Sequence, residues 1–165
     1  MSYIPKYILK RMFPKKKCLK VVKKDGKEYV WIQMTNVISP IAVPDKIDLG
    51  DFDPKDAPEY ADIAVNGTEL ELTLEDVKKY VEIWTDGKGY TYDDILVDNK
   101  AAGITIPVGG KLTLLIDKDY PGLADTIEGP GDYEVKVDVK LDNPMSITVK
   151  AQLKDIGVEF DPSET

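Results

Sequence analysis

The pattern that most constrains this chain is a strict alternation of apolar and polar residues across positions 131–153. Side chains repeat every two residues along a strand, so the pattern predicts two strands, each with one buried and one solvated face. Asp142-Asn143-Pro144 interrupts the alternation with turn residues, and a proline cannot continue the ladder. We therefore predict an antiparallel hairpin in which Val137 lies opposite Val149.

Turn signals divide much of the remaining chain into short strands. Asp25-Gly26, Asn66-Gly67 and Asp86-Gly87 each separate two apolar stretches, and such pairs favour the two-residue turn of a β-hairpin. Short strands at spacings of about 8–12 residues are typical of β-sandwiches and barrels. Residues 74–84 are compatible with either a helix or a strand, and we favour one helical turn near 74–78 followed by a hairpin.

The N-terminal segment has helical rather than β periodicity. Pro5 is tolerated at the start of a helix, and Pro14 would end one. About two helical turns are unstable alone, so this helix must pack on something. One face would be apolar and the other basic: the first has Ile4, Tyr7, Ile8 and Met12, the second has Lys6 and Lys10, and Arg11 lies at the boundary.

These patterns divide the chain into a basic N-terminal helical arm at 1–17, a β-sandwich domain at 18–160 and a frayed tail at 161–165. The fold class that we predict is all-β, an antiparallel β-sandwich with a short N-terminal helix. Residues 39–60 carry four prolines and are expected to form a long irregular surface connection. Loops of this length are uncommon unless they are functional or flexible.

A strand of sequence Gly-Gly-Lys-Leu-Thr-Leu, within residues 109–153, leads through a loop to Gly-Asp-Tyr-Glu-Val-Lys-Val and then to the hairpin. This order resembles the later strands of an immunoglobulin-like sandwich. The resemblance implies that Tyr133 occupies the tyrosine-corner position and that Trp31 or Trp84 is its buried tryptophan partner. It covers about a quarter of the chain and concerns the fold, which does not determine function.

The net charge of -8 conceals a strong asymmetry along the chain. Residues 1–27 hold ten basic side chains and one acid, a sum of +9, whereas residues 28–165 hold 12 basic side chains and 29 acids, a sum of -17. Such asymmetry is typical of an interaction tail. The acidic body would repel nucleic acid, and the apolar face of the arm is short for a membrane surface.

The acidic loop at 45–56 is the candidate site for a metal. Hard oxygen ligands in an irregular loop can hold Ca²⁺, although this spacing departs from the EF-hand pattern and we favour a solvated loop. Histidine is absent, which removes the commonest general base, and no spacing of carboxylates indicates a catalytic pair. The four candidate ligands are Asp48, Asp51, Asp53 and Asp56.

We therefore expect a non-catalytic interaction module without a cofactor, which docks on a protein partner or a second copy through its basic N-terminal segment. A ligand- or Ca²⁺-binding module using residues 45–56 and an Asp/Glu-based hydrolase are the alternatives. The chain shows no signal-peptide pattern and has a single cysteine, which favours a cytoplasmic location. The expected partner-binding residues are Ile4, Lys6, Tyr7, Ile8, Lys10, Arg11 and Met12.

Overall fold

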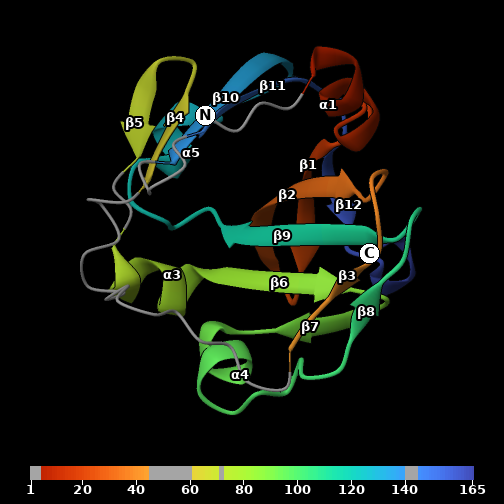
Figure 1. The fold of residues 1–165 in the computed structure, drawn as a ribbon. Helices are drawn as coiled ribbons and strands as arrows, with labels where there is room; N and C mark the ends of the chain where they lie inside the picture. The colour runs from red at the N-terminus through yellow and green to blue at the C-terminus, as the bar shows by residue number, and fades with distance from the viewer. Residues whose placement is uncertain (1–4, 45–60, 71–72, 140–144) are drawn as a thin grey trace.

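The computed structural model describes residues 5–44, 61–70, 73–139 and 145–165, and these are mostly β (Figure 1). The larger sheet contains, in spatial order, β12 (Ile156–Glu159), β1 (Leu19–Lys24), β2 (Lys27–Thr35), β9 (Lys111–Asp117), β6 (Val81–Thr85) and β7 (Lys88–Tyr90). A four-stranded sheet contains β11 (Met145–Leu153), β10 (Gly131–Val139), β4 (Ala61–Val65) and β5 (Thr68–Leu70). A small ribbon pairs β3 (Ile41–Ala42) with β8 (Thr105–Ile106).

Short helices connect or flank these strands: α1 (Lys6–Met12), α3 (Leu74–Tyr80), α4 (Tyr92–Leu96) and α5 (Leu123–Thr126), with a 3-10 turn at Pro162–Glu164. The strand pairings of the described residues are antiparallel, except that β1 and β12 run parallel. The prediction of a mostly β chain with antiparallel sheets is therefore confirmed. The immunoglobulin-like arrangement of those sheets stays a prediction.

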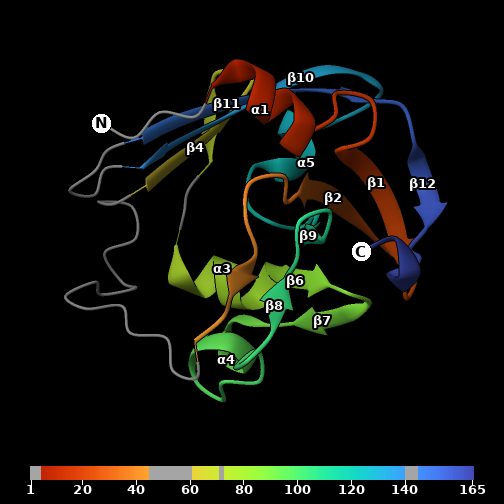
Figure 2. The same ribbon diagram turned by 45° about the vertical axis from the view of Figure 1, so that its right-hand side comes forward.

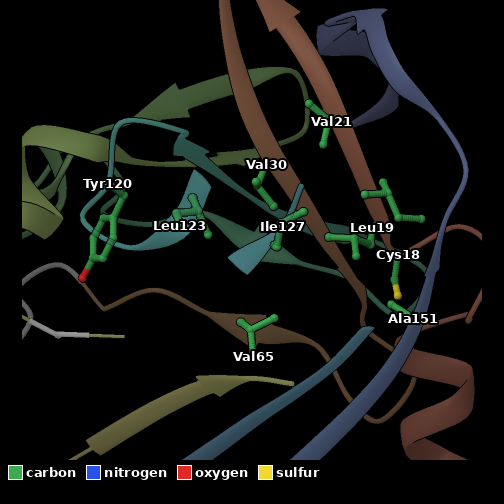
Figure 3. Packing of buried hydrophobic residues seen from close by; sticks show 10 residues of the cluster. Cys18, Leu19, Val21, Val30, Val65, Tyr120, Leu123, Ile127 and Ala151 are labelled. Carbon is green, nitrogen blue, oxygen red and sulfur yellow. The ribbon is translucent and has the colours of Figure 1, made fainter. Parts of the chain in front are cut away.

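The two larger sheets share one hydrophobic core (Figure 3). Val21 and Val30 contribute from the six-stranded sheet, while Val65 and Ala151 contribute from the four-stranded sheet. Leu123 of α5 packs into the same cluster and is 2% exposed. Each large aliphatic side chain buried in this way stabilises the fold by about 1.5–3 kcal/mol.

The opposite face of the six-stranded sheet is also covered. Val30 and Trp31 are neighbours on β2 and point to opposite faces, yet they are 0% and 3% exposed. Trp31 belongs to a second cluster, against which Trp84 and Phe160 pack. This strand is therefore buried on both sides. Trp31 is buried as the resemblance implied, but it lies outside the main core.

The three predicted two-residue turns are present, and each requires an unusual backbone conformation. The first residue of the turn has φ of 54° at Asp25, 50° at Asn66 and 51° at Asp86, and the glycine that follows is also at positive φ. Two consecutive positive φ angles match the right-handed twist of the flanking strands. Asparagine, aspartate and glycine tolerate this region better than other residues, which explains why the turns were visible in the sequence.

The register predicted for the long hairpin was wrong by two residues. Val137 lies opposite Ile147, and Val149 lies opposite Val135. A shift by an even number of residues leaves every side chain on its original face, so alternation alone cannot detect it. The predicted turn at 142–144 lies outside the described residues.

Short helices are a second difference from the prediction. α3 extends beyond the single turn expected at 74–78, and the hydroxyl of its N-cap, Thr73, accepts a hydrogen bond from the Asp76 N–H at 3.2 Å. The second strand of the predicted hairpin, β7, ends at Tyr90, and the helix α4 begins at Tyr92. Thr91 and Asp94 form a reciprocal capping box there, which stabilises a helix start. The all-β class is therefore corrected to a mostly-β fold with short helices.

The last residues of the chain make hydrogen bonds to β2 and to the turn at Gly87, and the frayed tail at 161–165 stays a prediction. The carbonyl of Glu164 accepts a hydrogen bond from Gln33 Nε2 at 2.7 Å. The hydroxyl of Thr165 accepts one from the Gly87 N–H at 3.1 Å, and Thr165 is 8% exposed. Burial and hydrogen bonding hold terminal residues in place regardless of their position in the sequence. The division into an arm at 1–17 and a domain at 18–160 stays a prediction.

Tyr133 makes the local contact that the resemblance implied. Its hydroxyl donates a hydrogen bond to the Gly129 carbonyl at 2.6 Å and accepts one from the Gly129 N–H at 3.3 Å. A tyrosine corner is defined by such a bond to the backbone a few residues upstream. This contact joins the loop after α5 to the beginning of β10.

The variant Tyr133→Phe tests the contribution of this contact. It should lower the free energy of unfolding by about 0.5–1.5 kcal/mol, because the hydroxyl bonds are lost while the ring packing remains. Urea denaturation monitored by circular dichroism measures the difference. Tyr7→Phe, at a side chain 67% exposed, is the control and should change stability by less than about 0.5 kcal/mol. Equal values for the two variants would show that the Tyr133 hydroxyl contributes nothing.

Candidate functional site

A groove of 780 Å³ lies between α1 and the strand β11. Figures 1 and 2 both place α1 next to this strand. Sites for small ligands and peptides have volumes of about 300–1,000 Å³. The groove is lined by Lys6, Leu9, Lys10, Phe13, Lys15, Thr148, Val149 and Lys150.

One wall of the groove is held in position by the C-terminal half of α1. Met12 is 9% exposed, and Phe13 packs against the main core. A seven-residue helix requires such packing, since it does not persist alone. Met12 was expected to bind a partner; in the structure it anchors the helix to the protein's own interior. Ile8, another expected anchor, is half-buried.

The connector after α1 is tied to β11 by a backbone hydrogen bond. The N–H of Gln152 donates to the carbonyl of Lys15 at 2.7 Å. This bond closes one end of the groove, because Lys15 belongs to the lining and Gln152 follows the lining residue Lys150 by two positions. The two walls are therefore linked directly as well as through the core.

The floor of the groove is apolar. Leu9 and Phe13 are four residues apart, so they lie on the same side of the helical segment. Val149 faces them from β11 and, like Phe13, packs at the margin of the main core. A ligand in the groove would therefore remove apolar surface from water, which is the main favourable term in most associations.

The rim of the groove is basic. Lys6, Lys10, Lys15 and Lys150 line it, and among the described residues no acidic side chain belongs to the lining. All four lysines are exposed, and none forms an ion pair with another side chain in the described part of the chain. Unpaired charges of one sign around a concave surface produce a local potential that attracts the opposite charge. The groove is thus a cationic site on a protein of net charge -8.

The structure brings part of the expected partner-binding set into this site. Lys6 and Lys10, which are four residues apart on one side of α1, line the groove. Tyr7 is 67% exposed and Arg11 is exposed, but neither belongs to the lining. Ile4 lies outside the described residues.

Sequence reasoning missed most of the groove. Leu9 and Phe13 have the same four-residue spacing as Lys6 and Lys10, and this second apolar row was a usable signal for half of the site. The other side of the groove is formed by Thr148, Val149 and Lys150 of β11, which follow α1 by about 140 positions in the sequence. No local pattern indicates that a strand will pack beside a helix so distant in sequence.

The acidic loop at 45–56, with Asp48, Asp51, Asp53 and Asp56, lies outside the described residues. Among the residues that the structure does describe, no group of three or more His, Cys, Asp or Glu side chains could hold a metal ion. The helices of the described ranges are all too short or too polar to cross a membrane.

Cys18 is buried at the start of the core, with 1% of its surface exposed. Burial raises the pKa of its thiol to about 11, because the charged thiolate is poorly solvated there. This environment suits a structural cysteine, since nucleophilic thiols are exposed and have lowered pKa values.

The thiol should therefore resist modification in the folded protein. At pH 8, a chromogenic disulfide reagent should react with Cys18 much more slowly in the native state than in urea. In the native state the reagent cannot reach the buried thiol, and only a small fraction of the thiol is ionised. Absorbance of the released thiolate measures the two rates. Equal rates in buffer and in urea would contradict the buried position.

Packing of α1 predicts a contrast between two of its residues. Met12→Ala should lower the free energy of unfolding by about 2 kcal/mol. This is the low end for a buried methionine, because a short helix can shift and so reduce the cavity that the substitution leaves. Tyr7→Ala should have an effect of less than about 0.5 kcal/mol. Chemical denaturation of both variants measures the contrast, and similar losses would mean that α1 packs differently.

Comparisons with known proteins supply no family for this chain. No protein-family model matches the sequence, and no curated protein matches it. Among solved structures, the chain is similar to the collagen-binding subdomain of the Enterococcus faecalis surface protein ACE, with 10% identity and a TM-score of 0.19. The alignment covers 94% of this chain and 100% of that subdomain. A similarity at this level carries no conclusion about fold or function.

Proposed function

We propose that this protein is a non-catalytic interaction module with an immunoglobulin-like β-sandwich, which docks on an acidic segment of a protein partner through the groove between α1 and β11. The observation that carries the proposal is the composition of that groove. An apolar floor of Leu9, Phe13 and Val149 is surrounded by lysines, and the described lining contains no acidic side chain. Apolar contact would give affinity, and the lysines would give orientation and rapid encounter.

Charge favours a protein segment over a nucleic acid. Residues 28–165 sum to -17, from 12 basic and 29 acidic side chains, so a long polyanion would be repelled wherever it left the groove. A short acidic segment avoids this repulsion, because charges beyond about 8 Å are largely screened at physiological salt. Lysines also adapt to carboxylates at varied positions, whereas they lack the planar fork that recognises phosphates and bases.

The lining also favours binding over catalysis. Its polar side chains are lysines and one threonine, with no carboxylate, histidine or cysteine to act as an acid–base partner. Cys18 is buried, as described above, and lies outside the lining. The groove therefore offers contact area and charge, which are the requirements of a docking surface.

Reversing the charge of the rim tests the proposal. The probe is an acetylated, amidated heptapeptide of alternating glutamate and valine. The double variant Lys6→Glu/Lys10→Glu should bind it about tenfold or more weakly, since each rim pair contributes up to about 1 kcal/mol and reversal adds repulsion. The variant should also lose the salt dependence of binding, as measured by isothermal titration calorimetry at two salt concentrations.

The control is Lys88→Glu/Lys111→Glu, which changes the net charge equally. Both lysines are exposed on the six-stranded sheet and lie outside the groove lining. The control should retain affinity within about threefold, because its charges are distant from the site and screened. Equal weakening in the two double variants would show attraction to net charge alone and would reject the groove.

A further inference from the structure

The groove opens on a sheet edge that has no partner strand in the described part of the chain. β11 is the outer strand of the four-stranded sheet, whose order is β11-β10-β4-β5. An edge strand presents a row of unpaired N–H and C=O groups to any chain that can approach it. Two independent observations determine which residues of β11 contribute to that row.

The first is the bond between Gln152 and Lys15. The Gln152 N–H points away from β10, since it donates to the Lys15 carbonyl at 2.7 Å. Residues in an antiparallel pair alternate between those that bond to the neighbouring strand and those that point away from it. Lys150 and Thr148, at two and four positions before Gln152, must therefore also direct their backbone groups to the free edge.

The second observation comes from the other side of β10. The Glu134 N–H donates to Asn66 Oδ1 at 2.8 Å, and the Glu134 carbonyl accepts from the Asn66 N–H at 2.8 Å. Both backbone groups of Glu134 are thus engaged away from β11. Glu134 lies opposite Lys150. Because the backbone groups of Glu134 point away from β11, these two residues form a pair without mutual hydrogen bonds. The two observations agree on the direction of the Lys150 backbone.

The free backbone groups belong to the same residues that line the groove. Thr148 and Lys150 are both in the lining, and no backbone hydrogen bond joins them to another described element. The carbonyl of Lys15 already bonds to this edge as the backbone of an added strand would, but only at the end of the groove. In the described part of the chain, the rest of this edge borders the groove between α1 and β11.

We infer that the occupant of the groove binds as an added β-strand: an extended segment of a partner protein, with alternating acidic and apolar residues, pairs with the free edge of β11. This inference rests on the proposed function and specifies its binding mode. Main-chain hydrogen bonds to Thr148 and Lys150 hold the segment, and the walls select its side chains. Alternate residues of a strand point to opposite sides, which allows carboxylates to meet lysines while apolar residues meet the floor.

The same lysines argue against a second copy of this chain as the occupant. Charged side chains, lysines especially, prevent identical sheet edges from pairing with each other. Two β11 edges would bring Lys150 and the lysines of α1 into mutual repulsion. An acidic strand from a different protein converts this repulsion into attraction.

Backbone methylation of the probe tests strand addition separately from charge. Two derivatives of the glutamate–valine heptapeptide are compared by calorimetry, one N-methylated at every valine and one at every glutamate. A strand paired on one side uses the N–H groups of alternate residues only. One derivative should therefore bind within about threefold of the unmethylated peptide, and the other should bind at least about tenfold more weakly. Equal affinities would overturn strand addition, although the charge-reversal result above could still hold.

A matched pair of protein variants tests the edge itself. Thr148→Pro removes the outward N–H and leaves the hydrogen bonds to β10 intact, because proline is tolerated on an edge. Thr148→Val removes the hydroxyl and keeps the N–H. The proline variant should bind the peptide at least about tenfold more weakly than the valine variant does. Equal binding by the two would overturn the inference.

Amide hydrogen exchange of the unmodified protein covers the case in which Thr148→Pro does not fold. Saturating peptide should slow exchange at Thr148 and Lys150, the residues whose N–H groups point outward, more than at Ile147 and Val149, which already bond to β10. No added protection at Thr148 and Lys150 would overturn strand addition.

Two further measurements test whether the groove has a different occupant. Laurate that displaces the peptide and binds more tightly would indicate a lipid-like anion. A dimer that forms without peptide, and is lost in Thr148→Pro, would indicate a second copy. Either result would overturn the assignment to an acidic partner strand.

Discussion

The packing of two sheets against one core determines where everything else in this protein lies. Val30 in the middle of β2 has no exposed surface, and Leu153 at the end of β11 is 1% exposed within the same cluster. Interiors are packed as densely as organic crystals, so the relative position of the sheets is fixed by these side chains. Phe13 contacts this core from the segment after α1, which places the helix beside β11. The basic groove is therefore a consequence of core packing.

Patterns that act within a few residues were predictable from the sequence. Alternation identified the faces of β10 and β11, and the turn at Asp25-Gly26 was recognisable because few other residues tolerate its backbone angles. The register of the hairpin was not predictable, because a two-residue shift preserves both faces. α4 was not predicted, because the turn signal at Asp86-Gly87 does not show where the following strand ends. The capping box of Thr91 starts the helix there.

The candidate site was predictable only on its helical side. Lys6 and Lys10 were identified from the charge asymmetry and the helical spacing, and the structure places both in the groove lining. Lys150 is one of several lysines on solvated strand faces, and nothing in its neighbours distinguishes it. Its role follows from the place of β11 at the sheet edge, which depends on pairings distant in the sequence.

The parallel pairing of β1 with β12 bears on how the chain folds during synthesis. Val21 lies opposite Ile156, so a strand made early must wait for one made more than 130 residues later. Proteins dominated by such distant contacts fold slowly. The entropy cost of closing a long loop must be met before the contacts between its ends can stabilise the fold. On the ribosome, the pair β1–β2 has one unpaired side until Ile156–Glu159 emerges. An unpaired strand edge of this kind makes the incomplete chain prone to aggregation, and chaperones bind chains in such states.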